Sequence, residues 1–195
     1  MCRLFWCHNG SVQYVQHESW LDMLDQTRHL VDGRGMLVDE DILETVAILR
    51  TIGVNTVSSC GGHLDRGYGP YVWFEAKDAA ADRARYAEYQ RAAKSDTPTD
   101  AVREVGRKIS RDEIAEKRKL FPYLEEFYAT RNSRFANRLL IENHGFAGTM
   151  LHCQGAMLVG VMGLEPLEVR RRLLKAHQRE MRDFTEFLKV KVLTK

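Results

Sequence analysis

The 195-residue chain has 29 basic and 27 acidic residues, a formal net charge of +2, and 44% hydrophobic residues. Its length fits one domain, its composition is that of a globular protein, and its small net charge does not favour bulk electrostatic binding to nucleic acid. No apolar run reaches the roughly 18 residues that a membrane-spanning helix needs. The first ten residues, MCRLFWCHNG, have no long apolar core after a basic start, so a secretory leader is not expected. Four scattered cysteines do not suit a disulfide-stapled domain, so reduced thiols, a cytosolic location and no membrane contact are expected.

A β-hairpin and two helices are predicted before the first central strand. An Asn-Gly pair within residues 3–17 separates two runs rich in aromatic and β-branched residues, and this pair suits a type I′ turn. Ser19 is a suitable N-cap for a helix that stops before Gly33. An apolar stripe that starts after Asp39 and stops at Gly53 predicts the second helix.

Two short strands and a helical insertion follow in the middle of the chain. The strands are expected at 54–58 and 71–75, with a glycine-rich loop between them. Residues 77–134 have the composition of exposed helices, and Ser110 with Glu113 forms a capping box that predicts a helix start within this insertion.

A second strand pair and a long helix are predicted at the C-terminal end. The β-prone runs 138–143 and 149–154 flank a glycine-containing turn, and Pro166 is placed to open a helix. Apolar residues recur every seven positions along it, at Leu167, Leu174, Met181 and Leu188. This stripe is interpreted as a core face, with a homodimer seam as the alternative.

The order of these elements predicts the fold class. Helices and hairpins are mixed without regular βαβ alternation, which indicates an α+β fold with a mainly antiparallel sheet built from hairpins. We expect a single domain over 1–195, with 77–134 as a helical insertion and a long C-terminal helix. Neither a Walker A sequence nor a G-x-G-x-x-G turn between a strand and a helix is present.

The stretch 57–75, VSSCGGHLDRGYGPYVWFE, contains the strongest candidate site. Its glycines allow several backbone N–H groups to converge, as an anion-binding nest requires. The alternative is that a long hairpin connection needs glycines for positive φ angles. The predicted ligand-binding residues are Ser58, Ser59, Gly61, Gly62, His63, Asp65, Arg66 and Tyr68.

Part of this loop resembles known proteins. The run NTVSSCGGH is similar to the SSCSGR loop of the methyltransferase family that acts in wybutosine synthesis on transfer RNA, and to an SCxGH loop of uncharacterised bacterial and phage proteins. His63 replaces the arginine of the first family, which removes a permanent cation, and Gly61 replaces its last serine. The resemblance implies a nucleotide or cofactor site, and an accessory protein of a bacterium or phage. The matching residues are Ser58, Ser59, Cys60 and Gly62.

Cys60 and His63 also suggest two other kinds of site. Their separation by two residues is a usable zinc-ligand spacing, and His144, His152 and Cys153 are candidates to complete a tetrahedral set. Alternatively, Cys60 is a nucleophile with His63 or His144 as its base. A buried, inert thiol is the simpler interpretation of Cys60.

The leading functional expectation is binding of a small anionic or nucleotide-like ligand through the loop 58–71. The alternatives are an enzyme that uses the same loop, either methyltransferase-like on RNA or a zinc or cysteine hydrolase, and a protein-interaction module that acts through the C-terminal helix.

Overall fold

A four-stranded antiparallel sheet is the centre of the computed structural model, which describes residues 11–65, 68–93, 99–160 and 165–194. The strand order is β1-β2-β4-β3, so two hairpins are joined through pairing of β2 with β4. The strands are β1 (Thr56–Cys60), β2 (Tyr71–Glu75), β3 (Leu139–Asn143) and β4 (Gly148–Cys153). The predicted α+β class with an antiparallel sheet is confirmed.

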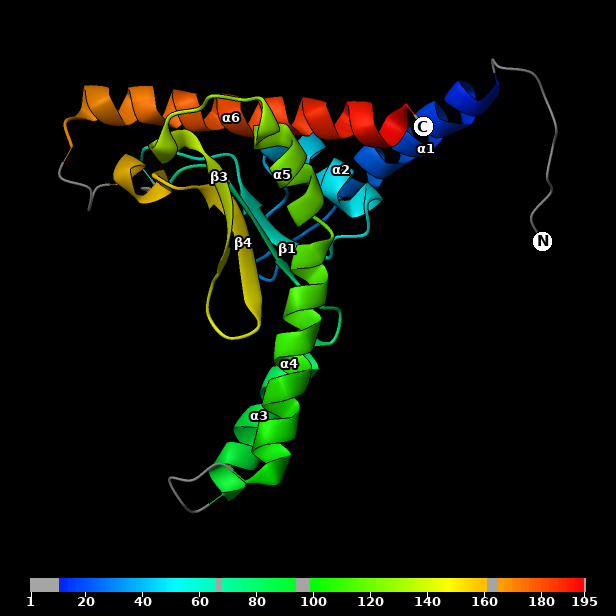
Figure 1. Ribbon diagram of the computed structural model, residues 1–195, viewed down its shortest axis with the longest axis vertical. Helices are drawn as coiled ribbons and strands as arrows, with labels where there is room; N and C mark the ends of the chain where they lie inside the picture. Colours follow the sequence, from blue (N-terminus) through cyan, green and yellow to red (C-terminus); the bar gives the residue numbers. More distant parts are fainter. Residues whose placement is uncertain (1–10, 66–67, 94–98, 161–164, 195) are drawn as a thin grey trace.

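Helices surround this sheet on one face and at one end. Figure 1 shows the long helix α6 across the sheet and the pair α3–α4 extending away from it as an arm. The described residues contain no helix that combines the length and the apolarity needed to cross a membrane. The α-helices are α1 (Ser11–Arg28), α2 (Leu43–Thr51), α3 (Ala79–Ala92), α4 (Asp100–Arg118), α5 (Phe121–Ala129) and α6 (Leu167–Leu193), and the short 3-10 helices are η1 (Glu40–Ile42), η2 (Phe135–Asn137) and η3 (Ala156–Val159).

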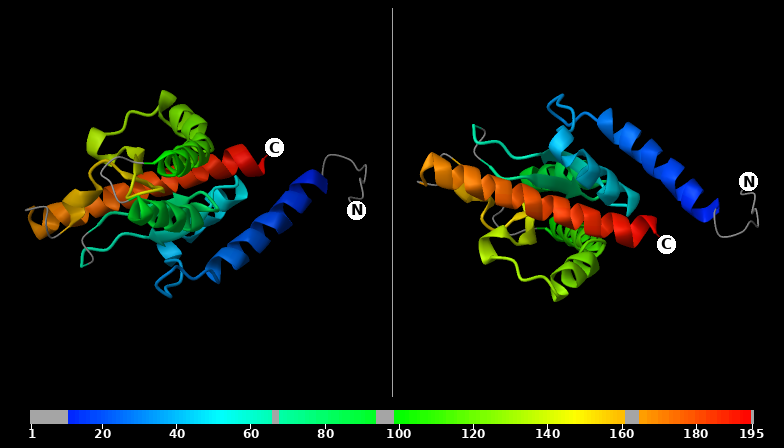
Figure 2. Two further views of the ribbon diagram at one scale, coloured as in Figure 1. Left: turned by 90° about the horizontal axis from the view of Figure 1, so that it is seen from below. Right: turned by 90° about the horizontal axis from the view of Figure 1, so that it is seen from above.

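The main core lies between the sheet and the helices α2, α5 and α6. Successive strand residues point to opposite faces, so Val72 and Phe74 of β2 face the helices and are fully buried. They share the main core with Phe184 of α6, which is also fully buried. Each such side chain contributes about 1.5–3 kcal/mol by leaving water. Figure 2 shows α1 and α2 on one side of α6 and α5 on the other, so α6 is the element around which the helices assemble.

Helix α6 begins directly after Pro166, as predicted, and extends for 27 residues. Of its predicted stripe, Leu174, Met181 and Leu188 are buried within the chain, whereas Leu167 is 48% exposed. The core-face interpretation is therefore confirmed for these three residues, and a homodimer through this helix stays a prediction.

The predicted N-terminal hairpin is wrong. Residues 11–17, which include its second strand, form the first turns of α1, and residues 3–10 lie outside the described part of the chain. Val12 and Val15 favour a strand only moderately, because β propensity depends on a partner strand and a buried face. The helix predicted from Ser19 extends backwards through them instead.

The predicted helix start at Ser110 is also wrong, because α4 continues through it from Asp100 to Arg118. Thr99 is the N-cap, and its hydroxyl accepts a hydrogen bond from the amide of Val102 at 3.4 Å. Val102, Val105 and Ile109 are buried at helical spacing before Ser110, and the buried face continues beyond it to Glu116. This apolar face outweighs the local capping signal.

The segment 77–134 contributes to two different parts of the structure. Helices α3 and α4 pair with each other around a small second core, which includes Val105 and Ile109 and also Ala147 of the β3–β4 turn. Leu124 and Phe127 of α5, in contrast, pack in the main core. The arm α3–α4 therefore has the character of an insertion, and the single-domain organisation with 77–134 as its insertion stays a prediction.

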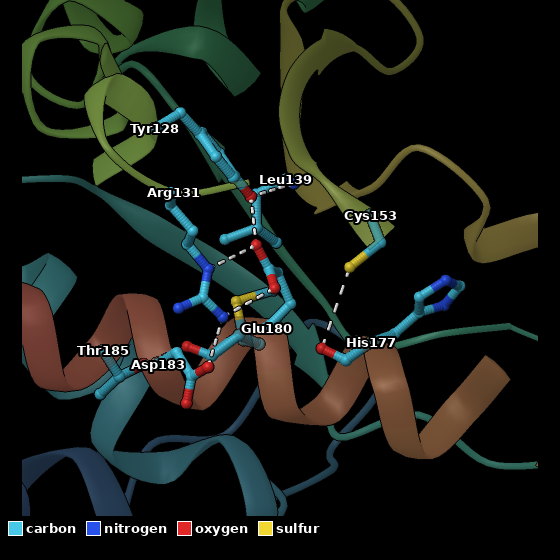
Figure 3. Close-up of polar contacts among 9 residues, drawn as sticks. Tyr128, Arg131, Leu139, Cys153, His177, Glu180, Asp183 and Thr185 are labelled. Atoms are coloured by element: carbon cyan, nitrogen blue, oxygen red, sulfur yellow. Dashed lines mark hydrogen bonds and ion pairs between the residues drawn. The ribbon is translucent and has the colours of Figure 1, made fainter. Parts of the chain in front are cut away.

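A buried carboxylate joins α5, α6 and β3. Figure 3 shows Glu180 of α6 between the Arg131 guanidinium and the Tyr128 hydroxyl. Arg131 donates to both oxygens of Glu180, at 3.2 and 3.0 Å, and also pairs with Asp183. Tyr128 donates to Glu180 at 2.9 Å and accepts from the amide of Leu139 at 2.7 Å. Because Glu180 is only 5% exposed, its charge depends on these partners.

Arg131→Met should lower the free energy of unfolding by about 2–3 kcal/mol, since it leaves the Glu180 carboxylate buried without its cation. This loss is smaller than the largest values measured for breaking buried ion pairs, because the Arg131 side chain is 33% exposed. Arg134→Met, at an exposed position three residues on, is the matched control. Urea unfolding measures both variants, and equal midpoints would contradict the stabilising role of the Arg131–Glu180 pair.

The imidazole of His177 is fully buried on α6, next to Gly69. Burial lowers the pKa of His177 to about 4, and the nearby carbonyl of Ala136 offsets only part of this effect. The ordinary histidine pKa, near 6.5, applies in the unfolded chain. Between these two pH values, His177 is protonated in the unfolded chain and neutral in the folded protein. The free energy of unfolding therefore decreases as the pH falls through this window.

We expect His177 to reduce the free energy of unfolding by about 3 kcal/mol between pH 7 and pH 4. His177→Leu should remove that part of the pH dependence, whereas His29→Leu, at the exposed end of α1, should leave it unchanged. Urea titrations at several pH values measure the difference. Parallel stability profiles for the wild type and His177→Leu would show that the buried imidazole is not responsible.

Candidate functional site

A pocket of about 550 Å³ lies between the segment 32–39 and the face of the sheet opposite the main core. The alternation of strand residues that sends Val72 and Phe74 into the core sends Tyr71 and Trp73 to this face. The volume is within the range of about 300–1,000 Å³ that is typical of small-molecule sites. We refer to this space as the ligand pocket.

One wall of the ligand pocket is aromatic. Tyr68 packs edge-on against Tyr71 with ring centroids 5.8 Å apart, and His144 packs edge-on against Trp73 at 5.0 Å. Burial raises the pKa of Tyr68 and of Tyr71, so both hydroxyls stay protonated near neutral pH. The wall thus offers ring faces together with hydroxyl donors.

The facing wall comes from the segment 32–39 and combines polar groups with the apolar side chains of Met36 and Leu37. The Asp32 carboxylate accepts hydrogen bonds from the amides of Arg34 at 2.8 Å and of Met36 at 3.0 Å. These amide hydrogen bonds hold the pKa of Asp32 below its ordinary value, so the group is ionised near neutral pH. Ser58 donates to the other Asp32 oxygen at 3.4 Å, which ties this segment to β1. The exposed side chain of Arg34 lines the same wall.

A thiol, an imidazole and a carboxylate meet at the edge of the pocket. Cys60 ends β1, and Gly62, at φ +86°, turns the chain so that His63 returns towards it. The Nε2 atom of His63 lies 3.1 Å from Oδ2 of Asp39. One side-chain atom from each of Asp39, Cys60 and His63 lies within 4.8 Å of the other two. We call these residues the Asp39–Cys60–His63 cluster.

Asp39 is the residue of this cluster that sequence reasoning missed. It directly precedes the second predicted helix, where an acidic residue is accounted for by a favourable interaction with the helix dipole. In the structure its side chain makes no capping hydrogen bond to the helix, and it accepts one from the amide of Gly61 at 2.9 Å. An acidic residue at a helix start carries no sequence signal that distinguishes these two roles.

The glycine-rich loop uses its backbone donors within the chain. The amide of Gly62 donates to the Cys60 sulfur at 3.4 Å, and that of His63 donates to the Tyr68 carbonyl at 3.3 Å. Gly69 donates to the Ala156 carbonyl at 3.1 Å. Together with the Gly61 amide, these groups are paired internally, so the described part of the loop does not present them as an open anion nest.

The remaining predicted ligand-binding residues occupy different places. Ser58 and Ser59 line the ligand pocket, and Tyr68 belongs to its aromatic wall. Asp65 is exposed at the tip of the loop. Arg66 lies outside the described residues, so its predicted role stays a prediction.

The other predicted catalytic and metal-binding residues do not join the Asp39–Cys60–His63 cluster. His144 lies against Trp73, whereas Cys60 pairs with Tyr71 across the β1–β2 ladder. Cys153 is in the main core on the opposite face of the sheet, where burial raises the pKa of its thiol.

His152, next to Cys153 in sequence, points to the pocket side of the sheet. Its Nε2 atom is 3.0 Å from Oε2 of Glu142, and its Nδ1 atom is 3.4 Å from the Tyr68 hydroxyl. Since adjacent strand residues face opposite ways, His152 and Cys153 cannot ligate one ion together.

Comparison with known proteins identifies no relative of this chain. No family model, no curated protein and no solved structure matches the chain. Function is therefore inferred from the residues of the ligand pocket and of the cluster beside it.

Proposed function

We propose that the chain binds a small nucleotide-like ligand in the ligand pocket. The observation that carries this proposal is the aromatic wall of Tyr68, Tyr71 and Trp73 opposite the ionised Asp32 carboxylate. A planar base stacks on aromatic faces, and its amino group or the hydroxyls of its sugar donate hydrogen bonds to carboxylates. Arg34 is placed to meet a phosphate at the outer side.

The charge of the pocket favours this class over a compact anion. Among the described residues that line it, two carry carboxylates, Asp32 and Asp39, and one, Arg34, carries a guanidinium. Like charges repel more strongly where water is partly excluded, so a compact, multiply charged anion is disfavoured. A ligand with a ring, several donors and one peripheral phosphate satisfies both walls.

Tyr71→Leu should weaken the binding of adenosine 5′-monophosphate about tenfold or more, because one stacked ring contributes roughly 1–3 kcal/mol. Isothermal titration calorimetry measures the affinity. Tyr89→Leu, on the arm helix α3, is the matched control and should bind as the wild type does. Equal affinities for adenosine 5′-monophosphate and ribose 5-phosphate would contradict recognition by stacking.

A hydrolytic enzyme is the second candidate, and the Asp39–Cys60–His63 cluster is the observation that favours it. Cys60 and Asp39 both line the ligand pocket, so a ligand held there lies beside a thiol and a carboxylate. The same three residue types serve either a cysteine nucleophile or a metal-activated water. Methyltransferase-like activity on RNA and an interaction role for α6 stay predictions.

If the cluster is catalytic, hydrolysis of a panel of nucleotide esters and phosphodiesters should disappear in Cys60→Ala. It should fall by about 100-fold or more in His63→Gln, which removes a general base or a ligand. Cys153→Ala is the matched control, because this thiol lies on the other face of the sheet. Turnover that is equal in the wild type and in Cys60→Ala would exclude the cluster from the reaction.

A further inference from the structure

The Asp39–Cys60–His63 cluster joins two parts of the chain that the loop motif alone does not connect. Cys60 is the last residue of β1, His63 lies in the loop that follows, and Asp39 comes from the segment before η1. We propose that these three side chains bind one divalent transition-metal ion of the zinc class, with an open coordination position that faces the ligand pocket. This proposal does not depend on the nucleotide-like ligand.

The distances within the cluster are close to those between ligand atoms around one ion. Zinc binds sulfur at about 2.3 Å and nitrogen or oxygen at about 2.0–2.2 Å, so tetrahedral ligand atoms lie roughly 3.3–3.7 Å from one another. The distance from His63 Nε2 to Asp39 Oδ2 is 3.1 Å, and the three ligand atoms all lie within 4.8 Å of one another. Small side-chain adjustments are enough to bring the three atoms to bonding distance.

The backbone holds the ligands in place. Amide groups donate to two of them, from Gly61 to the Asp39 carboxylate at 2.9 Å and from Gly62 to the Cys60 sulfur at 3.4 Å. Such N–H donors stabilise a thiolate and a carboxylate, which are the forms that bind a metal. They therefore act as supporting contacts around the ligands.

Close packing favours glycine at position 61 and requires it at position 62. A Cβ atom at Gly61 would lie 3.0 Å from that of Asp41, and one at Gly62 would lie 2.8 Å from the backbone nitrogen of Pro70. Gly62 also has a φ of +86°, which side-chain-bearing residues rarely adopt. The two glycines of the Cys-Gly-Gly-His sequence thus allow the backbone turn that brings the His63 side chain close to Cys60.

The donor set and its location indicate an exchangeable site. Sulfur, nitrogen and oxygen ligands together suit zinc and related ions better than magnesium or calcium, which prefer oxygen alone. Three protein ligands leave one tetrahedral position free, as in catalytic zinc sites. The side chains of His63 and Asp39 are 34% and 27% exposed, and Asp39 and Cys60 line the ligand pocket, so an ion has access from that side.

Titration of tag-free, chelator-treated full-length protein with Co²⁺ tests the proposal. We expect about one equivalent to bind, with a thiolate-to-cobalt charge-transfer band and the visible bands of a tetrahedral site, and Zn²⁺ should displace it. Cys60→Ser should abolish the charge-transfer band. Asp39→Asn should weaken the affinity by about tenfold or more.

Asp41→Asn is the matched control, since it removes the same charge two residues away at an exposed position next to Gly61. Circular dichroism checks that each variant folds. If Cys60→Ser does not fold, the comparison of Asp39→Asn, which preserves side-chain volume, with Asp41→Asn still tests the proposal. The absence of stoichiometric metal uptake would overturn the proposal, and so would binding that is equal in Asp39→Asn and Asp41→Asn. Selective alkylation of Cys60 without metal uptake would indicate a nucleophile instead.

Discussion

The alternation of side chains along β2 is the constraint on which the rest of the structure depends. Val72 and Phe74 point into the core beneath α6, and the residues between them, Tyr71 and Trp73, necessarily point the other way. The buried face holds the sheet against the helices, and the opposite face becomes the aromatic wall of the ligand pocket. A shift of one residue in the register of this strand would exchange the two faces and lose both features.

The position of the candidate site follows from how the β1–β2 loop is anchored. Gln178 of α6 donates to the carbonyl of Gly61 at 3.0 Å, and Arg170 donates to that of Leu64 at 2.7 Å. The long helix that completes the core therefore also holds the loop. The amide of Gly61 in turn donates to the Asp39 carboxylate at 2.9 Å, which brings the segment before η1 to the same place. Helix α6 thus contributes both to the packing of the main core and to the geometry of the candidate site.

Much of the fold could be predicted because its signals are local. Tyr71–Glu75 is the strand expected, and Pro166 precedes a helix that buries Leu174, Met181 and Leu188. The errors arise where a local signal competes with a longer apolar pattern. Ser110 has the form of an N-cap, yet Val105 and Ile109 before it continue the buried face of α4. Similarly, Val12 and Val15 lie in α1 rather than in a hairpin.

The sequence by itself determined the fold class, the approximate positions of the strands and the stretch that carries Cys60 and His63, because alternation, glycine turns and proline starts act over a few residues. The first central strand, expected at 54–58, is Thr56–Cys60, so Cys60 lies in a strand and not in the loop. Only the tertiary structure decided what surrounds that loop. Asp39 lies 21 residues before Cys60 in the chain, and no local pattern relates them. Cys153 and His152 are neighbours in sequence but lie on opposite faces of the sheet. Contacts between distant segments depend on the packing of the whole chain, and this packing selected the partners of Cys60 and His63.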